Sequence, residues 1–443
     1  MDPVRRGQGT RPTPPSMPEP TVTVRMREGA ERWASCPARA AAATAVPACR
    51  LDRGRRSTNL PRGCASTARW TPTPKDRAGQ VGQVDAAQAH DQRFMRRAVV
   101  LAERGRHTVS PNPLVGCVLV DPADGAVVAE GWHERAGEPH AEAAALAAAG
   151  ERAAGATAYV TLEPCAHRGR TPPCADALIA AGVARVVVAL ADPNALAAGG
   201  TPRLRAAGIA VDEGCLADEV RRQNAVFLHG LATGRPYVVA KAAVSLDGRI
   251  AAADGSSQWL TGPATRERVH ALRAEVDAVL VGSGTVLADN PSLTCRLPGY
   301  DGPQPLRVVL DTRGRTPAGA AVTDDAAPTL IWDGNRNLDS LLGVLWGRGV
   351  RSVLLEGGAA VLHSFLAAGL VDRLHVHVAP VLLGERGRPL LAGPWVETIA
   401  DAPRFRLDAV EQVDDDALLT LLPVEPARTP YEYDLHDFSR GAR

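Results

Sequence analysis

The chain has 443 residues, which is more than one hydrophobic core usually organises, so we expect two domains. Its formal net charge is +1, but residues 1–80 carry 15 Lys/Arg against 6 Asp/Glu, and the remainder carries 35 against 43. This balance and an aromatic content of 4% argue against nucleic-acid binding, and no run of about 18 apolar residues indicates a membrane span. The eight irregularly spaced cysteines are too few for a disulfide scaffold, so we expect a reducing, cytoplasmic location.

The N-terminal region, residues 1–85, is rich in Pro, Arg, Gly, Ser and Thr and has no sustained apolar periodicity. We therefore expect a disordered basic extension, in which Cys36, Cys49 and Cys64 have no site role. A basic arm for nucleic acid or membrane, or a targeting peptide, is the alternative. The start of the chain lacks the compact apolar segment of a secretory signal.

Ordered structure is expected from near Asp91, and apolar residues at helical spacing predict a first helix over 93–105. Strands and helices then alternate along the chain. The predicted strands are 114–120, 125–132, 156–164 and 184–190, the first two forming a hairpin. The predicted helices are 141–149, 174–182 and 201–208. This alternation predicts an α/β domain over residues 91–230 with helices on both faces of its sheet.

A joint with Gly and Pro at residues 230–236 separates this region from a second alternation. The predicted strands there are 236–245, 277–282, 305–311, 328–333, 352–358 and 372–384. The predicted helices are 262–276, 338–349 and 359–369. We expect a second α/β domain over residues 236–425 and a polar tail at 426–443.

The strongest chemical signal is the run His140-Ala141-Glu142, followed by Cys165 and Cys174, each of which is preceded by Pro. One imidazole and two thiolates provide three ligands and leave zinc a fourth position, where the metal lowers the pKa of a water molecule. Glu142 begins a predicted helix and is placed to carry protons. The generic cytidine-deaminase pattern has two residues between its cysteines, whereas this chain has eight. A structural zinc site is the alternative, but three ligands beside an acid favour an open catalytic site.

Three runs resemble the deaminase half of the bifunctional riboflavin-biosynthesis deaminase–reductase family: SPNPLVGCVLV (110–120), AGEPHAEAAAL (136–146) and TLEPCAHRGRTPPCADALI (161–179). The resemblance implies a cytidine-deaminase-like α/β/α domain with zinc on His140, Cys165 and Cys174 and with Glu142 as the proton carrier. It also implies that Asn112, His133 and Arg170 contact the substrate. Asn112 suits a pyrimidine edge and Arg170 suits a phosphate, although loop structure alone is the alternative for each.

The second half lacks a G-x-G-x-x-G dinucleotide fingerprint, and Gly282-Ser283-Gly284 is only a fragment of one. Residues 354–366 read as an apolar strand, an acid, two glycines and an amphipathic helix. Such a turn can hold a phosphate at the helix N-terminus, or the glycines serve only the turn.

Four runs resemble the family's reductase half, which has a dihydrofolate-reductase-like α/β fold: residues 241–251, 256–296, 308–317 and 354–374. The resemblance implies that NADPH contacts Ala243, Trp259, Thr285, Asp289, Thr312, Gly358, Ala359, Ala360, Val361, Leu362, His363 and Ser364. It implies that the substrate contacts Ser257, Arg273, Leu293, Arg296 and Glu356. Lys241 and Asp289 are candidates for proton delivery, with a salt bridge between strands as the alternative.

Two departures from the family pattern stand out. Within residues 191–209, Ala195 and Ala197 replace the usual Pro and Val, so we expect a local change of loop structure. The connection over residues 316–352, around Asn335, is shorter than usual for the family. A shorter connection would trim the sheet beside the cofactor, so it bears on cofactor affinity more than on the type of reaction.

We therefore expect a bifunctional enzyme that uses Zn²⁺ and NADPH on one small pyrimidine ribonucleotide, without nucleic-acid or membrane partners, and leave homo-oligomerisation open. The resemblance implies hydrolytic deamination of 2,5-diamino-6-ribosylamino-4(3H)-pyrimidinone 5′-phosphate, followed by reduction of its ribosyl chain. The alternatives are a chain with only one active half, a zinc-dependent deaminase of another nucleotide or nucleic-acid base, and a non-catalytic binding protein with structural zinc.

Overall fold

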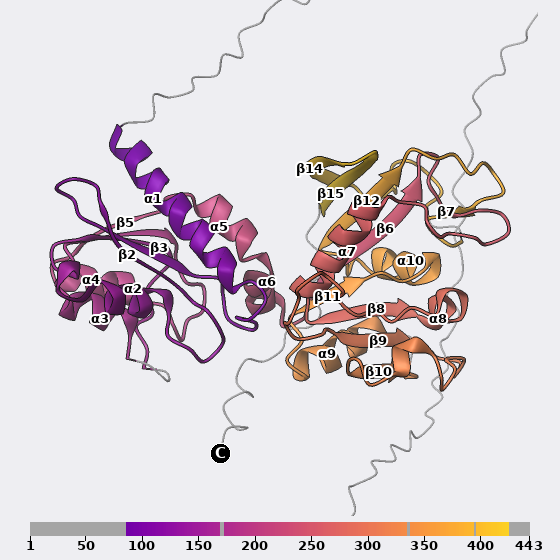
Figure 1. The fold of residues 1–443 in the computed structure, drawn as a ribbon, viewed down its shortest axis with the longest axis horizontal. Coiled ribbons are helices and arrows are strands. Elements are labelled where there is room, and N and C mark those ends of the chain that lie inside the picture. Colours follow the sequence, from indigo (N-terminus) through magenta and orange to yellow (C-terminus); the bar gives the residue numbers. More distant parts are fainter. Residues whose placement is uncertain (1–85, 169–171, 335–336, 394–395, 425–443) are drawn as a thin grey trace, which may run out of the picture. The chain divides into compact units, whose positions relative to one another are not determined.

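The computed structural model describes residues 86–168, 172–334, 337–393 and 396–424, which form two open sheets with separate cores (Figure 1). The predicted extension 1–85 with its three cysteines, Arg170, Asn335 and the tail 426–443 lie outside the described residues. None of the helices within these ranges combines the length and the apolar character that crossing a bilayer requires.

The N-terminal sheet has the strand order β2-β1-β3-β4-β5. Its strands are β1 (Gly116–Val120), β2 (Val127–Trp132), β3 (Thr157–Leu162), β4 (Arg185–Leu190) and β5 (Ala210–Glu213). The predicted hairpin of β1 and β2 is antiparallel, and β1 also pairs antiparallel with β3. The pairs β3–β4 and β4–β5 are parallel, as expected where a helix connects successive strands.

Helices cover both faces of this sheet because alternate residues of its central strands point to opposite sides (Figure 1). Cys117 and Leu119 of β1 pack toward α2 (Ala141–Ala149), α3 (Cys174–Ala180) and α4 (Gly200–Ala206). Val118 and Val120 pack toward α1 (Ala86–Ala102) and α5 (Ala217–Gln223). The predicted three-layer α/β/α architecture is confirmed.

The first helix begins at Ala86, earlier than the expected start of order near Asp91 and the predicted helix over 93–105. The additional turn is anchored by tertiary contacts. Asp91 accepts a hydrogen bond from the Tyr159 hydroxyl (2.9 Å) and forms an ion pair with Arg185 (2.7 Å). Such anchors join residues far apart in the sequence, so helical periodicity does not reveal them.

The predicted joint at 230–236 is partly helical, because α6 (Ala225–Thr233) continues through its first residues. The helix ends at Gly234, whose φ of 66° is a left-handed conformation that glycine adopts without strain. The described residues also include three short 3-10 helices: η1 (Glu103–Gly105), η2 (Gly150–Ala153) and η3 (Ala321–Thr323).

The C-terminal sheet has the strand order β10-β9-β8-β11-β6-β12-β15-β14. Its parallel strands are β6 (Tyr237–Ser245), β8 (Ala278–Gly282), β9 (Leu306–Leu310), β10 (Thr329–Trp332), β11 (Ser352–Leu355) and β12 (Arg373–Ala379). The antiparallel hairpin of β14 (Phe405–Val413) and β15 (Asp416–Pro423), which the sequence pattern did not predict, extends this sheet. A separate two-stranded ribbon joins β7 (Arg249–Ala251) to β13 (Arg388–Pro389).

Two apolar clusters fill the faces of this second sheet. One includes residues of α9 (Leu338–Gly347) and α10 (Ala359–Ala367), whose Leu345 and Phe365 are fully buried. The other includes Val286 of α8 (Ser283–Asp289) and is covered in part by α6 and by α7 (Pro263–Glu275). The sequence pattern predicted α7, α9 and α10, but it did not predict α8, which begins at the weak Gly282-Ser283-Gly284 fragment.

Candidate functional site

Three predicted metal ligands converge from three elements of the N-terminal sheet region. His140 is the residue before α2, Cys165 follows β3 through a Glu-Pro turn, and Cys174 is the first residue of α3. The Nδ1 atom of His140 lies 3.6 Å from Sγ of Cys165 and 3.3 Å from Sγ of Cys174. All three ligand atoms lie within 4.8 Å of one another.

The geometry and charge of this trio fit a zinc ion. Tetrahedral ligands that are each about 2.0–2.3 Å from one zinc are about 3.5 Å apart, close to the two distances observed. Hydrogen bonding with the Cys174 side chain and with His140 lowers the pKa of Cys165 to about 4. With that thiolate beside it, the pKa of Cys174 is raised by its hydrogen bond with Cys165 and by burial. Two neighbouring thiolates would repel each other, and a bound divalent cation would offset that repulsion.

Glu142 lies in the first turn of α2, two residues after His140, and only 3% of its surface is exposed. Burial raises the pKa of Glu142 to about 7, although the nearby His140 opposes the shift. A carboxyl group that gains and loses a proton near neutral pH suits general acid–base chemistry. The structure thus places the predicted proton carrier beside the ligand trio.

Asn112 and His133, the two described residues predicted to bind the deaminase substrate, form a pair. The Asn112 side-chain amide donates to Nε2 of His133 (3.1 Å), while Nδ1 of His133 donates to the Pro139 carbonyl (3.1 Å). The His133 ring stands edge-on to the His140 ring at 5.6 Å, and burial lowers the pKa of His133. A neutral His133 therefore accepts one hydrogen bond and donates the other, which fixes its ring next to the metal ligand.

The loop that carries the Ala195 and Ala197 departures lies against the ligand trio. Ala197 is buried in one small cluster with Cys165 and Cys174, and its carbonyl accepts a hydrogen bond from the Ala166 amide (3.0 Å). The altered loop therefore contributes directly to the wall behind the two sulfur ligands, a contact that the sequence did not reveal.

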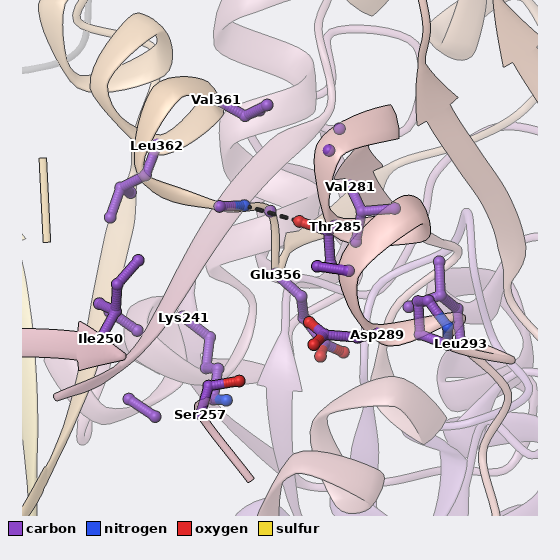
Figure 2. A pocket seen from close by; sticks show the side chains of 18 of the residues that line it. Lys241, Ile250, Ser257, Val281, Thr285, Asp289, Leu293, Glu356, Val361 and Leu362 are labelled. Carbon is purple, nitrogen blue, oxygen red and sulfur yellow. Dashed lines mark hydrogen bonds between the residues drawn. The ribbon is translucent and has the colours of Figure 1, made fainter. Parts of the chain in front are cut away.

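The C-terminal sheet contains a cavity of about 1650 Å³ at the carboxyl ends of β6, β8, β9 and β11 (Figure 2). Ligands of open parallel sheets bind at this edge. The predicted reductase-site residues that line it are Lys241, Ala243, Ser257, Trp259, Arg273, Thr285, Asp289, Leu293, Arg296, Thr312, Glu356, Gly358, Ala359, Ala360, Val361, Leu362 and Ser364. His363 is the one predicted reductase residue that does not line this cavity.

An ion pair that the sequence did not reveal lies at the wall of this cavity. The Arg273 guanidinium binds both carboxylate oxygens of Glu356, with Nε–Oε1 of 2.6 Å and Nη2–Oε2 of 2.9 Å, and Nη1 donates to the Thr294 carbonyl. Burial alone would raise the pKa of Glu356, but Arg273 outweighs burial and holds it below its usual value. Arg273 thus fixes an ionised Glu356 at the end of β11, and fewer of its donors remain for a phosphate.

Lys241 and Asp289, the predicted proton-delivery pair, both line the cavity (Figure 2). Lys241 lies on β6 and Asp289 ends α8, and no ion pair joins the two side chains within the described ranges. The charges that act on Lys241 belong to Glu356 and Arg273, and burial lowers its pKa. Burial raises the pKa of Asp289, against the influence of Arg388. Both groups are therefore shifted toward their neutral forms.

The glycine turn before α10 fits a phosphate-bearing cofactor. The Gly358 amide donates to the Thr285 hydroxyl (3.1 Å), so this turn is tied to α8 (Figure 2). A side chain at Gly357 would place its Cβ only 3.1 Å from Cβ of Val361 and 3.4 Å from the Gly282 amide nitrogen. The turn therefore leaves little room for a side chain at Gly357 and presents the N-terminus of α10 to the cavity, an arrangement that suits a phosphate group.

Several basic residues of the cavity were not predicted as ligands. Arg266 stacks on the Trp259 ring at 4.5 Å from its centroid, and Trp259 remains 70% exposed. Arg315 donates to the Ser283 hydroxyl (2.9 Å), and Arg388 also lines the cavity. A single arginine carries no spacing signal, so the sequence did not select Arg266 or Arg388, and for Arg315 it favoured surface solvation over contact with a 2′-phosphate.

Comparison with known families defines the class of protein. Residues 88–190 match the family model for the cytidine and deoxycytidylate deaminase zinc-binding region, and residues 236–419 match the RibD C-terminal domain. The chain therefore joins a zinc-binding deaminase domain to a reductase domain, and the predicted fold class and metal chemistry are confirmed.

Full-length relatives identify the family. The Escherichia coli K12 riboflavin biosynthesis protein RibD is 45% identical over 365 residues, covering 75% of this chain and 99% of that protein. The Mycobacterium tuberculosis H37Rv protein of the same name is 46% identical over 348 residues, covering 77% and 98%. The chain belongs to the RibD family of bifunctional deaminase–reductases in riboflavin biosynthesis.

Solved structures agree with this assignment. Acinetobacter baumannii RibD is 43% identical, and the match covers 76% of this chain and all of that one with a TM-score of 0.70. A Thermotoga maritima diaminohydroxyphosphoribosylaminopyrimidine deaminase/5-amino-6-(5-phosphoribosylamino)uracil reductase is 36% identical, with coverage of 76% and 99% and a TM-score of 0.71. The predicted combination of deamination, reduction and zinc is thereby supported.

Proposed function

We propose that the enzyme deaminates 2,5-diamino-6-ribosylamino-4(3H)-pyrimidinone 5′-phosphate and then reduces the ribosyl chain of the product with NADPH. The observation that carries the proposal is the ligand trio, whose three atoms lie within 4.8 Å of one another beside the buried Glu142. The name of the T. maritima relative, which describes both reactions on such ribosylated pyrimidines, supports the choice of substrate.

His140, Cys165 and Cys174 would hold the zinc ion in the deaminase domain. Zinc, when bound, supplies a water molecule of lowered pKa. Glu142 would accept a proton from the water that attacks the ring carbon bearing the 2-amino group, and would return a proton to the departing nitrogen, which leaves as ammonia. Asn112 and His133 orient the pyrimidine edge, and Arg170 is proposed to meet the phosphate.

In the reductase domain, the glycine turn and the residues predicted for NADPH would bind the cofactor, which supplies hydride when bound. Ser257, Leu293, Arg296 and the Arg273–Glu356 pair would position the substrate. Reduction of the ring-opened ribose adds hydride to C1′ and one proton to the adjacent nitrogen. Lys241 and Asp289 are the ionisable groups proposed to deliver this proton, because both face the cavity and both have shifted pKa values.

The proposal is tested by measuring ammonia release and NADPH oxidation on one preparation of the full chain with the proposed substrate. We expect one NADPH oxidised for each ammonia released. Removal of zinc by a chelator should stop ammonia release, and added zinc should restore it. A Cys174→Ser variant should lose ammonia release, whereas Cys215→Ser, outside the trio, should keep it. Release of no ammonia by the zinc-loaded chain would refute the proposal.

A further inference from the structure

Glu163 lies between β3 and the proposed ligand Cys165 and is only 8% exposed. Its carboxylate accepts three hydrogen bonds from one backbone loop. Oε1 accepts from the amides of Gly199 (3.1 Å) and Thr201 (2.9 Å), and Oε2 accepts from the amide of Asp192 (3.2 Å). A buried carboxylate therefore holds both ends of the segment 192–201, which we call the backing loop.

The backing loop reaches the metal ligands through its middle. Ala197 is 7% exposed and packs in one cluster with Cys165 and Cys174. The Ala197 carbonyl accepts from the Ala166 amide (3.0 Å), which directly follows Cys165 in the chain. The loop thus packs through Ala197 in one cluster with both sulfur ligands.

The start of α4 fits closely against the same turn. A side chain at Gly200 would place its Cβ 1.7 Å from the carbonyl oxygen of Pro164, so this position tolerates only glycine. Pro164 lies between Glu163 and Cys165, and the Arg203 guanidinium donates to the Ala166 carbonyl (3.3 Å). A displacement of the backing loop would therefore be transmitted to the turn that carries Cys165.

Apart from its bonds to Glu163, the Ala166–Ala197 bond and the packing of Gly200 on Pro164, the contacts of the loop are local. Its internal hydrogen bonds are local: the Asn194 amide donates to Asp192 Oδ1 (2.9 Å), and the Leu196 amide donates to Asn194 Oδ1 (3.1 Å). Leu196 is 81% exposed, so it adds little packing. Glu163 binds three backbone amides at the two ends of the loop, which makes it the main side-chain link between the loop and the turn that carries Cys165.

We propose that Glu163 is a positioning residue for the zinc site, which acts by holding the backing loop so that Ala197 keeps Cys165 and Cys174 at ligand distance. The proposal rests on the proposed zinc site. In metalloproteins, altering a group that orients a metal ligand without touching the metal usually lowers metal affinity about 10- to 100-fold.

Glu163→Gln tests the proposal with almost no change in size. One carboxylate oxygen becomes an NH₂ group, which cannot accept a hydrogen bond from an amide. Either the Asp192 amide or the Gly199 and Thr201 amides then lose their acceptor. Glu213→Gln is the matched control, because Glu213 binds Arg205 near the other end of α4 (2.8 Å) and lies on the surface.

The readout is the rate at which the purified full chain transfers zinc to a chromophoric chelator, with far-UV circular dichroism as the measure of folding and NADPH-dependent reductase turnover as the check that the other domain is unaffected. We expect roughly 10- to 100-fold faster zinc transfer for Glu163→Gln, with reductase turnover and Glu213→Gln both at the wild-type level. Unchanged zinc transfer in Glu163→Gln would overturn the proposal. A wild-type chain that holds no zinc would instead refute the proposed zinc site itself.

A second variant keeps the proposal testable if Glu163→Gln does not fold. Ala197→Gly removes the methyl group that packs on the two cysteines but leaves all three bonds to Glu163. We expect zinc transfer to accelerate about two- to fivefold, since one buried methyl group is worth roughly 0.8 kcal/mol. Wild-type zinc transfer in Ala197→Gly would contradict the role of the backing loop.

Discussion

The two sites of this chain are built in opposite ways. The deaminase site uses a few side chains whose ligand atoms lie within 4.8 Å of one another and come from the start of α2, the end of β3 and the start of α3. The reductase site is a cavity of about 1650 Å³ bordered by many residues, several of them glycine or alanine. One site depends on side-chain chemistry, and the other depends largely on backbone shape.

This difference determines how each site can be recognised. Only a few side chains bind zinc, so His140, Cys165 and Cys174 stand out even at an unusual spacing. A cavity that binds a cofactor through backbone amides and small residues has no such chemical restriction, and no dinucleotide fingerprint marks it here. The same difference predicts that single substitutions should disable the first site more completely than the second.

The largest expected effect follows from Glu142→Gln, which keeps the size of the buried side chain but removes its ability to carry a proton. Deamination should fall about 10²- to 10⁴-fold, the usual contribution of general acid–base catalysis. Zinc content and reductase turnover should remain at the wild-type level, as should all three quantities in the control Glu151→Gln on the surface. Measurable deamination near the wild-type rate would show that another group carries the proton.

Lys241→Met should impair the reductase alone. The substitution keeps the length of the side chain but removes the ammonium group that faces the cavity beside Glu356 and Arg273. We expect NADPH oxidation to fall about 10²-fold, with ammonia release unchanged. Steady-state assays of both reactions on one preparation provide the comparison. A tenfold or smaller change in reductase turnover would exclude Lys241 as the main proton donor.

Acid should destabilise the reductase domain through one buried and two half-buried histidines, His377, His229 and His375. Burial lowers the pKa of His229 and of His375 to about 4, and that of His377 to about 3. Because these folded-state values lie below the unfolded value of about 6.5, the stabilisation is complete above pH 6.5 and is lost as the pH falls toward 4. Each histidine should cost about 2 kcal/mol of unfolding free energy at pH 5.

Calorimetry at pH 7.5 and pH 5 measures this loss, and the unfolding transition that NADPH shifts upward belongs to the reductase domain. In His377→Leu, the loss between the two pH values should be smaller than in the wild type by about 2 kcal/mol. An equal loss in both proteins would show that His377 does not contribute to acid sensitivity.

The smallest effect is expected for Trp259→Ala. The indole ring is 70% exposed, lines the cavity and is stacked by Arg266, so it offers a flat face to a cofactor ring. Loss of this face should raise the KM for NADPH about 3- to 10-fold and change kcat little. Leu382→Ala, at a similarly exposed apolar residue that does not line the cavity, is the control. An unchanged KM would place the cofactor ring elsewhere.

The alternating order of strands and helices could be predicted because apolar periodicity is a local property. Two kinds of element escaped this reasoning. Helix α8 is short and begins with Ser-Gly, and tertiary contacts such as the packing of Val286 against the sheet stabilise it. Strand β14 lies at the sheet edge, where exposed charged residues such as Glu411 mask the strand pattern.

The metal ligands and Glu142 could be selected from sequence because their residue types are chemically restricted. Their supporting contacts could not. The bonds from the backing loop to Glu163 and the pairing of Arg273 with Glu356 join segments that are distant in the chain. Nothing in the local sequence indicates which arginine meets which acid, so these contacts required the folded structure.

The most direct test of the central claim is X-ray absorption spectroscopy at the zinc edge of the purified full chain, together with metal analysis. We predict one zinc per chain, bound by two sulfur atoms at about 2.3 Å and by lighter ligands at about 2.0–2.1 Å. Loss of one sulfur neighbour in Cys165→Ser would assign the site. A wild-type chain without zinc, or with Cys165 and Cys174 joined in a disulfide, would contradict the account.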